Sequence, residues 1–362
     1  MAIPPGDPAV TRTGGPLIVM DVGGTTLRVG TFDVRGGGRL SDVARMRVDG
    51  MDRHPGTPVP VLQRQVVDQI VREAERRAGT PWAGTRPGPA PAALAVAFAG
   101  PVARDGIVLG APTVWGEGGE PLPLQEVLSA RLSVPVLVVN DLTAAAWRYG
   151  TESTVPFCLL TVSSGIGNKV FRDGDVLLDA GGYGGELGHW TCDRSPDAPL
   201  CDCGGRGHLG AIASGRGVLA AVRRAAAADP AGYARSAPAR AGTADPRFLG
   251  NPEIAEAVRN GDPFTTAVLR STLVHLAAAV GAVFASIGIR RYVLMGGFAL
   301  AIGERYRELL VEELVRQGCF GLAAAQVDAM VVLGEDDDDH GLIGVGRLMA
   351  RRLAAHREKV TL

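Results

Sequence analysis

The chain has 362 residues, of which 46% are apolar and 21% are charged, and its formal net charge is −1. This length allows two domains, and the apolar share excludes a disordered chain. The balanced charge, without a block of Lys or Arg, argues against nucleic acid or a membrane as a partner. No basic start followed by an apolar run opens the chain, and the longest apolar stretch, residues 276–289, is too short for a membrane span. We therefore expect a soluble cytoplasmic protein.

Short apolar runs bounded by Gly, Pro or polar residues predict strands along the first half of the chain. They cover residues 16–21, 27–33, 93–99 and 134–139. A glycine turn joins the first two, which predicts a hairpin. Helical spacing of apolar residues predicts helices over residues 61–78 and 142–149. Residues 1–15 and 80–91 are rich in Pro and Gly and predict a loose tail and a linker.

The second half begins with a buried strand, predicted over residues 157–162, that ends at another glycine turn. From Ser214 onward the pattern is mainly helical. It is interrupted by a strand over residues 291–295 and closes with a helix over residues 341–356. The acidic run at residues 335–339 predicts a solvated loop that could lie at the edge of a nucleotide site.

Strand-and-turn units on both sides of a strand-to-helix switch predict an α/β fold with two similar halves facing each other across a cleft. We expect a small domain over residues 16–141, completed by a C-terminal helix over residues 341–362. The large domain is expected over residues 142–340.

Three glycine turns follow predicted strands and are candidates for binding a nucleotide. They are Asp21-Val-Gly23-Gly24-Thr25-Thr26, Ser164-Gly165-Ile-Gly167 and Gly296-Gly297. Glycines let the backbone turn tightly, so that several N–H groups can point at a phosphate, and the threonines add hydroxyl donors. Asp21 is suited to hold Mg²⁺ through water. Each turn alone also fits an ordinary loop, and none is a Walker A loop, because its Lys-Ser/Thr pair is missing.

Asn140 and Asp141 end a buried strand and open a helix. Ligands of open α/β sheets gather at such strand ends, and a helix N-terminus favours an ionised carboxylate. Asp141 is therefore a candidate general base that accepts the proton of an attacking hydroxyl, while Asn140 could hold a neighbouring hydroxyl. The alternative is an aspartate that only caps the helix.

A metal site is predicted where soft ligands cluster in a glycine-rich loop. The set is His189, Cys201, Cys203 and His208. Two thiolates and two imidazoles suit tetrahedral Zn²⁺, and Cys192 could replace either histidine. Four protein ligands leave no open position for a substrate, so the ion is expected to be structural and to fix Glu186 and His189.

These motifs together resemble the ROK family of sugar kinases and repressors, within the actin/hexokinase-like superfamily. The matching segments are Asp21-Val-Gly-Gly-Thr-Thr, Gly100-Pro101, Asn140-Asp141, Ser164-Gly-Ile-Gly, Gly185-Glu-Leu-Gly-His and Cys201-Asp-Cys-Gly-Gly-Arg-Gly. They fall in family order over residues 16–350. The combination of the last two segments is specific, whereas the single glycine turns are not.

The resemblance implies a two-domain, actin-like ATPase fold that closes on a sugar and binds MgATP. It implies that Asp141 is the general base and that Asp21 helps to hold magnesium. The residues implied to bind substrate are Gly100, Asn140, Asp141, Glu186 and His189, the last of which also binds zinc. The turns at Gly23–Thr26 and Ser164–Gly167 would cradle phosphates, and Gly296-Gly297 would lie near the adenosine. A homodimer is also implied, with the helical region 266–289 as one source of its surface.

Two positions depart from the family pattern. His208 stands where a third Cys is usual, an exchange that zinc tolerates. Gly210 stands where a Glu usually contacts the sugar, near its anomeric end. A site that hydrogen-bonds hydroxyls discriminates sharply by those bonds, so this loss favours a substrate without an ordinary anomeric centre, such as a C7-cyclitol.

An ATP-dependent sugar or cyclitol kinase is therefore the first hypothesis, with a glucokinase or another hexose or amino-sugar kinase as the alternative substrate class. A sugar-responsive repressor would need a DNA-binding helix-turn-helix before Asp21, where only about twenty residues, rich in Pro and Gly, are present. A non-catalytic sugar-binding regulator is the third reading, and the presence of Asp21 and Asp141 argues against it.

Overall fold

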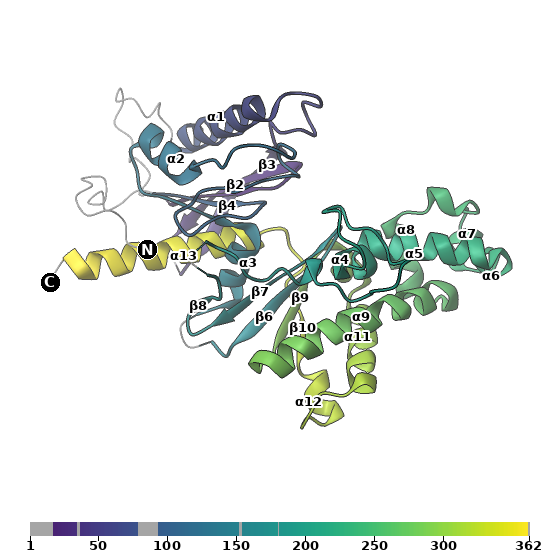
Figure 1. The fold of residues 1–362 in the computed structure, drawn as a ribbon. Coiled ribbons are helices and arrows are strands. Elements are labelled where there is room, and N and C mark those ends of the chain that lie inside the picture. Colours follow the sequence, from purple (N-terminus) through teal and green to yellow (C-terminus); the bar gives the residue numbers. More distant parts are fainter. Residues whose placement is uncertain (1–16, 35–36, 79–92, 152–153, 180, 361–362) are drawn as a thin grey trace. The chain divides into compact units, whose positions relative to one another are not determined.

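The computed structural model describes residues 17–34, 37–78, 93–151, 154–179 and 181–360. The tail and the linker predicted over residues 1–15 and 80–91 lie outside this part. Contacts group the chain into two compact units. The first contains residues 1–152, 174–184 and 337–362, and the second contains residues 153–173 and 185–336. Figure 1 labels the elements of both units, which are described one at a time.

The first unit is built on a five-stranded sheet in the order β3-β2-β1-β4-β5. Its strands are β1 (Leu17–Val22), β2 (Thr26–Asp33), β3 (Arg39–Arg47), β4 (Ala93–Phe98) and β5 (Val136–Asn140). β1 pairs antiparallel with β2, as the hairpin prediction required, and parallel with β4, which pairs parallel with β5. The sequence did not predict β3, because this edge strand carries four charged residues and is mostly solvent-facing.

Helices cover both faces of this sheet. They are α1 (Val59–Ala78), α2 (Leu124–Leu132), α3 (Asp141–Tyr149) and α13 (His340–Val360). Ile18 and Met20 of β1 share a buried core with apolar residues of α1 and α2. Because strand side chains alternate, Asp21 points to the opposite face, where α13 packs against β1 and β4. The contacts place α3 in the first unit, so the boundary between the units lies after this helix, whereas the sequence placed it at residue 141.

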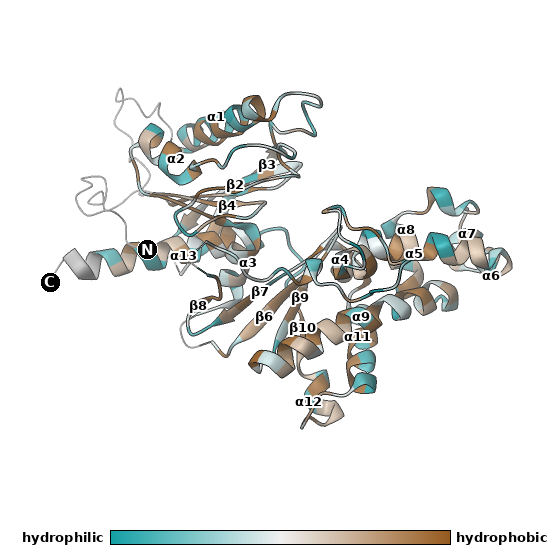
Figure 2. Cartoon of the chain, in the orientation of Figure 1, coloured by the Kyte–Doolittle hydropathy of each residue, from teal (hydrophilic) through white to brown (hydrophobic). Residues whose placement is uncertain are grey.

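The second unit contains four strands in the order β10-β9-β6-β7. They are β6 (Phe157–Val162), β7 (Ile166–Arg172), β9 (Tyr292–Met295) and β10 (Val331–Leu333), while the two-residue β8 (Asp175–Val176) belongs to the first unit. β6 pairs antiparallel with β7 and parallel with β9. The sequence did not predict β7, which carries Asn168 and Lys169 at its centre, or the three-residue β10. Figure 2 shows the strands of both units mostly in the colour of apolar residues.

An irregular loop over residues 190–208 is followed by a mainly helical chain, as expected from Ser214 onward. The helices of the second unit are η2 (Leu187–His189), α4 (Leu209–Ala213), α5 (Gly215–Ala228), α6 (Pro230–Ala234), α7 (Ala237–Arg240), η3 (Pro246–Phe248), α8 (Asn251–Arg259), α9 (Pro263–Ile287), α10 (Gly297–Ile302), α11 (Glu304–Gln317) and α12 (Ala324–Asp328).

Helix α9 corrects one expectation. The apolar stretch expected over residues 276–289 was too short to span a membrane. The helix itself has 25 residues, and by length and composition it could cross one, so this expectation was wrong. Leu269, Leu273, Leu276 and Val280 of this helix are fully buried in the core of the second unit. These contacts are those of a core helix in a globular domain.

Candidate functional site

The carboxyl ends of three neighbouring parallel strands carry the predicted site residues of the first unit. Asp21 lies at the end of β1, Gly100 follows β4, and Asn140 and Asp141 join β5 to α3. Because β1, β4 and β5 are adjacent and parallel, these ends meet at one edge of the sheet. The structure therefore brings together four of the predicted residues.

Asn140 is the residue that caps helix α3. Its Oδ1 accepts hydrogen bonds from the backbone N–H groups of Leu142 and Thr143, both at 3.1 Å. Its Nδ2 donates to the carbonyl of Gly100 at 2.9 Å and to Oδ1 of Asp141 at 2.8 Å. The amide thus ties the ends of β4 and β5 together and holds the next side chain.

Asp141 is the first residue inside the helix and not its cap. Its Oδ1 accepts from the backbone N–H of Leu142 at 2.8 Å as well as from Asn140. Hydrogen bonds from N–H donors and the positive end of the helix favour the ionised carboxylate. An ionised, oriented carboxylate is what a general base requires.

Asp21 is largely buried, with 13% of its side chain exposed, and faces Arg28 across the hairpin. Arg28 donates to Oδ2 of Asp21 at 3.3 Å. Burial and the nearby charge of Asp141 raise the pKa of Asp21 to about 7, although Arg28 acts in the opposite direction. A Cβ on Gly341 would lie 2.8 Å from the carboxyl carbon, so the start of α13 packs directly on Asp21. A buried carboxyl that is costly to ionise is well suited to hold a cation.

The turn after β1 is tight, as the glycines predicted. The N–H of Gly23 donates to the carbonyl of Thr26 at 2.9 Å, and the carbonyl of Thr25 accepts from Val48 at 3.0 Å. A Cβ on Gly24 would lie 2.7 Å from the carbonyl oxygen of Thr113, so this glycine allows close backbone approach. The sequence did not identify Thr113 as a neighbour of this turn, since nothing local links the two segments.

The other two glycine turns lie side by side in the second unit, because β6 and β9 are adjacent and parallel. Gly296 has a φ of +100°, and a Cβ there would lie 2.6 Å from the carbonyl oxygen of Val162. A Cβ on Gly297 would lie 3.9 Å from Oγ of Ser163. The N–H of Gly215 donates to the carbonyl of Ser163 at 2.8 Å.

The segment that opens helix α5 is a neighbour of these turns that the sequence did not identify. Nε of Arg216 donates to the carbonyl of Ser164 at 2.7 Å. The Ser-Gly-Arg-Gly run at residues 214–217, just before a helix, was the available signal.

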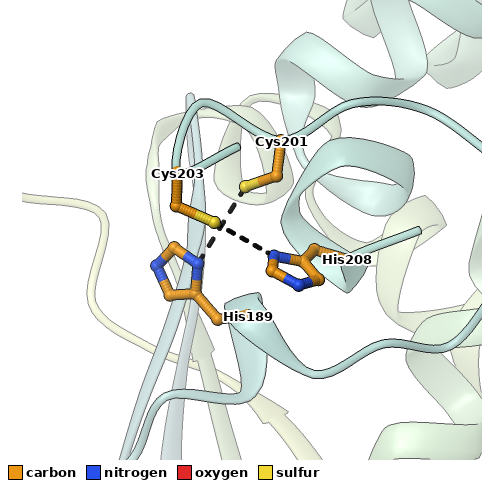
Figure 3. A group of neighbouring side chains, drawn as sticks. All are labelled: His189, Cys201, Cys203 and His208. Carbon is orange, nitrogen blue, oxygen red and sulfur yellow. Dashed lines mark hydrogen bonds between the residues drawn. The ribbon is translucent and has the colours of Figure 1, made fainter. Parts of the chain in front are cut away.

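The four predicted metal ligands gather in one place in the second unit (Figure 3). His189 ends η2, Cys201 and Cys203 lie in the following loop, and His208 is the residue just before α4. One ligand atom from each residue lies within 4.8 Å of the other three. Ligand atoms around tetrahedral zinc are roughly 3.3–3.8 Å apart, given bond lengths of about 2.0–2.3 Å. The set therefore fits zinc after a small contraction.

The glycines of this loop have defined steric roles. A Cβ on Gly207, whose φ is +67°, would lie 1.7 Å from the carbonyl oxygen of Asp193. A Cβ on Gly205 would overlap the ring of His208. Cys192, the alternative ligand, is not in the group: its Sγ is 3.5 Å from the carbonyl oxygen of Gly207, and burial raises its pKa to about 11.

Glu186 lies three residues before the predicted metal ligand His189 and has a basic neighbour. Nζ of Lys169, on β7, lies 3.8 Å from Oε1 of Glu186, and 5% of the lysine side chain is exposed against 60% of the glutamate. Oδ1 of Asn168 accepts from the N–H of Leu187 at 3.0 Å. Asn168 and Lys169 of strand β7 thus contact the Gly-Glu-Leu-Gly-His segment. The sequence did not predict this contact.

The acidic run at residues 335–339 is not merely solvated. Asp337 forms an ion pair with Arg148, which lowers the pKa of this aspartate to about 2. Asp338 lies 3.4 Å from Arg28, the arginine that also contacts Asp21. Asp339 lies 3.3 Å from Arg45. The run therefore attaches the start of α13 to the sheet of the first unit.

Comparison with known proteins identifies the family. The model described as the ROK family matches residues 18–352. A protein of Streptomyces hygroscopicus subsp. jinggangensis (strain 5008), named C(7)-cyclitol 7-kinase, is 52% identical over 350 residues, which cover 96% of this chain and 98% of that protein.

Two solved structures have the same fold. A ROK hexokinase from Thermus thermophilus has a TM-score of 0.64 and 26% identity, with coverage of 92% of this chain and 97% of that one. A ROK family transcriptional regulator, a homolog of the E. coli MLC protein, has a TM-score of 0.74 at 22% identity, with coverage of 96% and 81%, and shows the fold alone. The predicted actin-like ATPase fold of the sugar kinases is confirmed, and the chain belongs to the ROK family.

Proposed function

We propose that this chain is an ATP-dependent kinase that phosphorylates a primary hydroxyl of a C7-cyclitol. The proposal is carried by one observation: a chain that aligns Asp21, Gly100 and Asp141 at adjacent strand ends is 52% identical, almost throughout, to a C(7)-cyclitol 7-kinase. The geometry supports the reaction type, and the relative supports the acceptor.

Phosphoryl transfer asks the protein for positioning, charge neutralisation and a base. In the proposed reaction Asp141 accepts the proton of the attacking hydroxyl, and its orientation is set by the N–H of Leu142 and the amide of Asn140. Asn140 acts mainly through Asp141, because its amide is already engaged by the helix and by Gly100. Glu186 and His189 would bind other hydroxyls of the substrate.

The nucleotide and its magnesium ion would supply the phosphoryl group and the counter-charge. Asp21 would hold the ion through water, since its buried carboxyl gains most from a nearby cation. The backbone N–H groups of residues 23–26 and 164–167 would bind phosphates. Gly296 and Gly297 would lie beside the adenosine.

Zinc is proposed as a structural ion bound by His189, Cys201, Cys203 and His208. The supporting observation is the convergence of four soft ligands held by short, glycine-rich loops. Bound there, zinc would join the η2 segment to the start of α4. It would thereby fix the position of Glu186, three residues before His189.

Gly210 supports the cyclitol over glucose. It is the second residue of α4, and a Cβ there would lie 3.1 Å from the carbonyl oxygen of Gly188. The position therefore lies against the proposed substrate-binding segment and offers no side chain to an anomeric hydroxyl. An ordinary hexose would lose a hydrogen bond here that a substrate without an anomeric centre does not need.

The deciding measurement is kcat/KM with MgATP for a valiolone-type cyclitol and for glucose. We expect the cyclitol to be the better acceptor. A hundredfold preference for glucose, about 2.7 kcal/mol in the transition state, would replace the cyclitol by a hexose and leave the kinase assignment intact. No transfer to any polyol would refute the kinase itself.

We also propose a homodimer, with α9 as one source of its surface. Helix α9 exposes Ile287 near its end, while its core face is buried. Light scattering at micromolar concentration should give twice the mass of one chain, and the mass of a single chain would refute the dimer.

A further inference from the structure

Lys169 is unusual in this chain both by its type and by its burial. The sequence contains 35 arginines and only two lysines, Lys169 and Lys359. Lys169 is 4% exposed in the middle of strand β7. Burial of a cation is costly unless a partner compensates it, so such a lysine calls for a specific explanation.

The side chain of Lys169 packs closely against the segment that carries Glu186. The side chain lies on the face of β7 opposite Asn168, whose amide points toward Cys158 in the core. A Cβ on Gly185 would lie 3.1 Å from Cδ of Lys169, so the aliphatic stem passes closely under this glycine. This close contact constrains the path of the stem, and Nζ lies beside the segment that carries Glu186.

The carboxylate that forms an ion pair with Lys169 is that of Glu186. Its Oε1 is 3.8 Å from Nζ, a distance of a close ion pair that is longer than a hydrogen bond. The glutamate is 60% exposed and would otherwise select among several rotamers in water. The buried ammonium group of Lys169 favours the rotamers of Glu186 that keep its carboxylate near Nζ.

We propose that Lys169 is a positioning residue for substrate recognition, which holds the carboxylate of Glu186 in the orientation that accepts hydrogen bonds from hydroxyls of the acceptor. This inference rests on the proposed kinase function and adds to it the residue that sets the geometry of Glu186. Lys169 acts on the acceptor through Glu186, so its removal should affect the acceptor KM less once Glu186 has lost its charge.

A double-mutant cycle tests the coupling. The variants are Lys169→Met, Glu186→Gln and the double substitution, with Lys359→Met as the matched control that removes the other lysine. KM and kcat are measured separately for the cyclitol and for ATP, and zinc content and thermal unfolding are recorded for each variant. We expect Lys169→Met to raise the acceptor KM about tenfold with less than a twofold change in the KM for ATP.

The double variant distinguishes a positioning role from an independent one. In the Glu186→Gln background, Lys169→Met should change the acceptor KM by less than about twofold, because the group that it positions has lost its charge. An equal tenfold effect in both backgrounds, or an effect mainly on the KM for ATP, would overturn the proposal. Should Lys169→Met not fold, Lys169→Gln is carried through the same cycle. If the unmodified protein phosphorylates no polyol, the kinase proposal fails first, and that result is distinct from an unchanged acceptor KM.

Discussion

Replacement of Asp21 by Asn should make the free protein more stable while it abolishes the reaction. The pKa of Asp21 is raised from 3.8 to about 7 by burial and by Asp141, so the folded state holds this proton more tightly than the unfolded chain. Folding then takes up a proton between pH 4 and 7, and stability falls as the pH rises through this range. Above pH 7 Asp21 is ionised in the folded state, and the full free-energy cost of this buried charge lowers the stability.

The size of the pKa shift of Asp21 sets an upper limit on the free-energy cost of its ionisation in the folded state. About three pKa units correspond to roughly 4 kcal/mol at 1.36 kcal/mol per unit. Exposure of 13% of the Asp21 side chain and the remaining partner of Arg28, Asp338 at 3.4 Å, reduce the net change. We therefore expect Asp21→Asn to stabilise the protein by about 1–3 kcal/mol at pH 8.5 and by about half as much at pH 5.5.

Thermal unfolding between pH 5.5 and 8.5, without nucleotide or magnesium, measures this difference. Each kcal/mol should raise Tm by about 2–4 °C. Asp338→Asn is the matched control, because it removes the other carboxylate beside Arg28, one that is 67% exposed. A variant that is less stable than the unmodified protein at pH 8.5, or a gain that does not shrink toward pH 5.5, would refute the buried-charge argument. MgATP should stabilise the unmodified protein more than Asp21→Asn, since the cation offsets the charge.

Three further predictions concern the base, the metal and the acceptor. Asp141→Asn should keep the fold but lose about two to four orders of magnitude in kcat, measured by coupled ATP turnover, and near-normal turnover would show that the base is another group. Freshly purified protein should contain about one zinc per chain, and Cys201→Ser should lower both zinc content and Tm; metal analysis without zinc would contradict the site. Gly210→Glu should shift the ratio of kcat/KM for glucose over cyclitol upward by at least about tenfold, and an unchanged ratio would show that residue 210 does not face the acceptor.

The sequence by itself determined the parts of the molecule that depend on local chemistry. Buried strands such as β4 and β6 are continuous apolar runs between turn residues, and the glycines after β1 and β9 mark backbone that must turn or approach closely. The Cys and His spacing indicated a metal set whose four ligand atoms the folded chain brings within 4.8 Å of one another. These features need only neighbours in the chain, so their residues are sufficient to predict them.

Tertiary structure alone decided the features that join distant segments. Strands β3 and β7 are polar enough to resemble loops and become strands only because a neighbour pairs with them. The acidic run at residues 335–339 meets arginines roughly 190 to 310 residues earlier, which no local pattern encodes.

The sequence also could not predict which of Asn140 and Asp141 caps the helix, because either residue type caps a helix well. The hydrogen bonds of the folded chain assign the cap to Asn140 and leave Asp141 oriented inside the first turn. The same holds for Lys169, whose significance lies in burial beneath Gly185 and Glu186. Burial and partner choice are properties of the packed chain, and they decide which of several chemically suitable side chains acts.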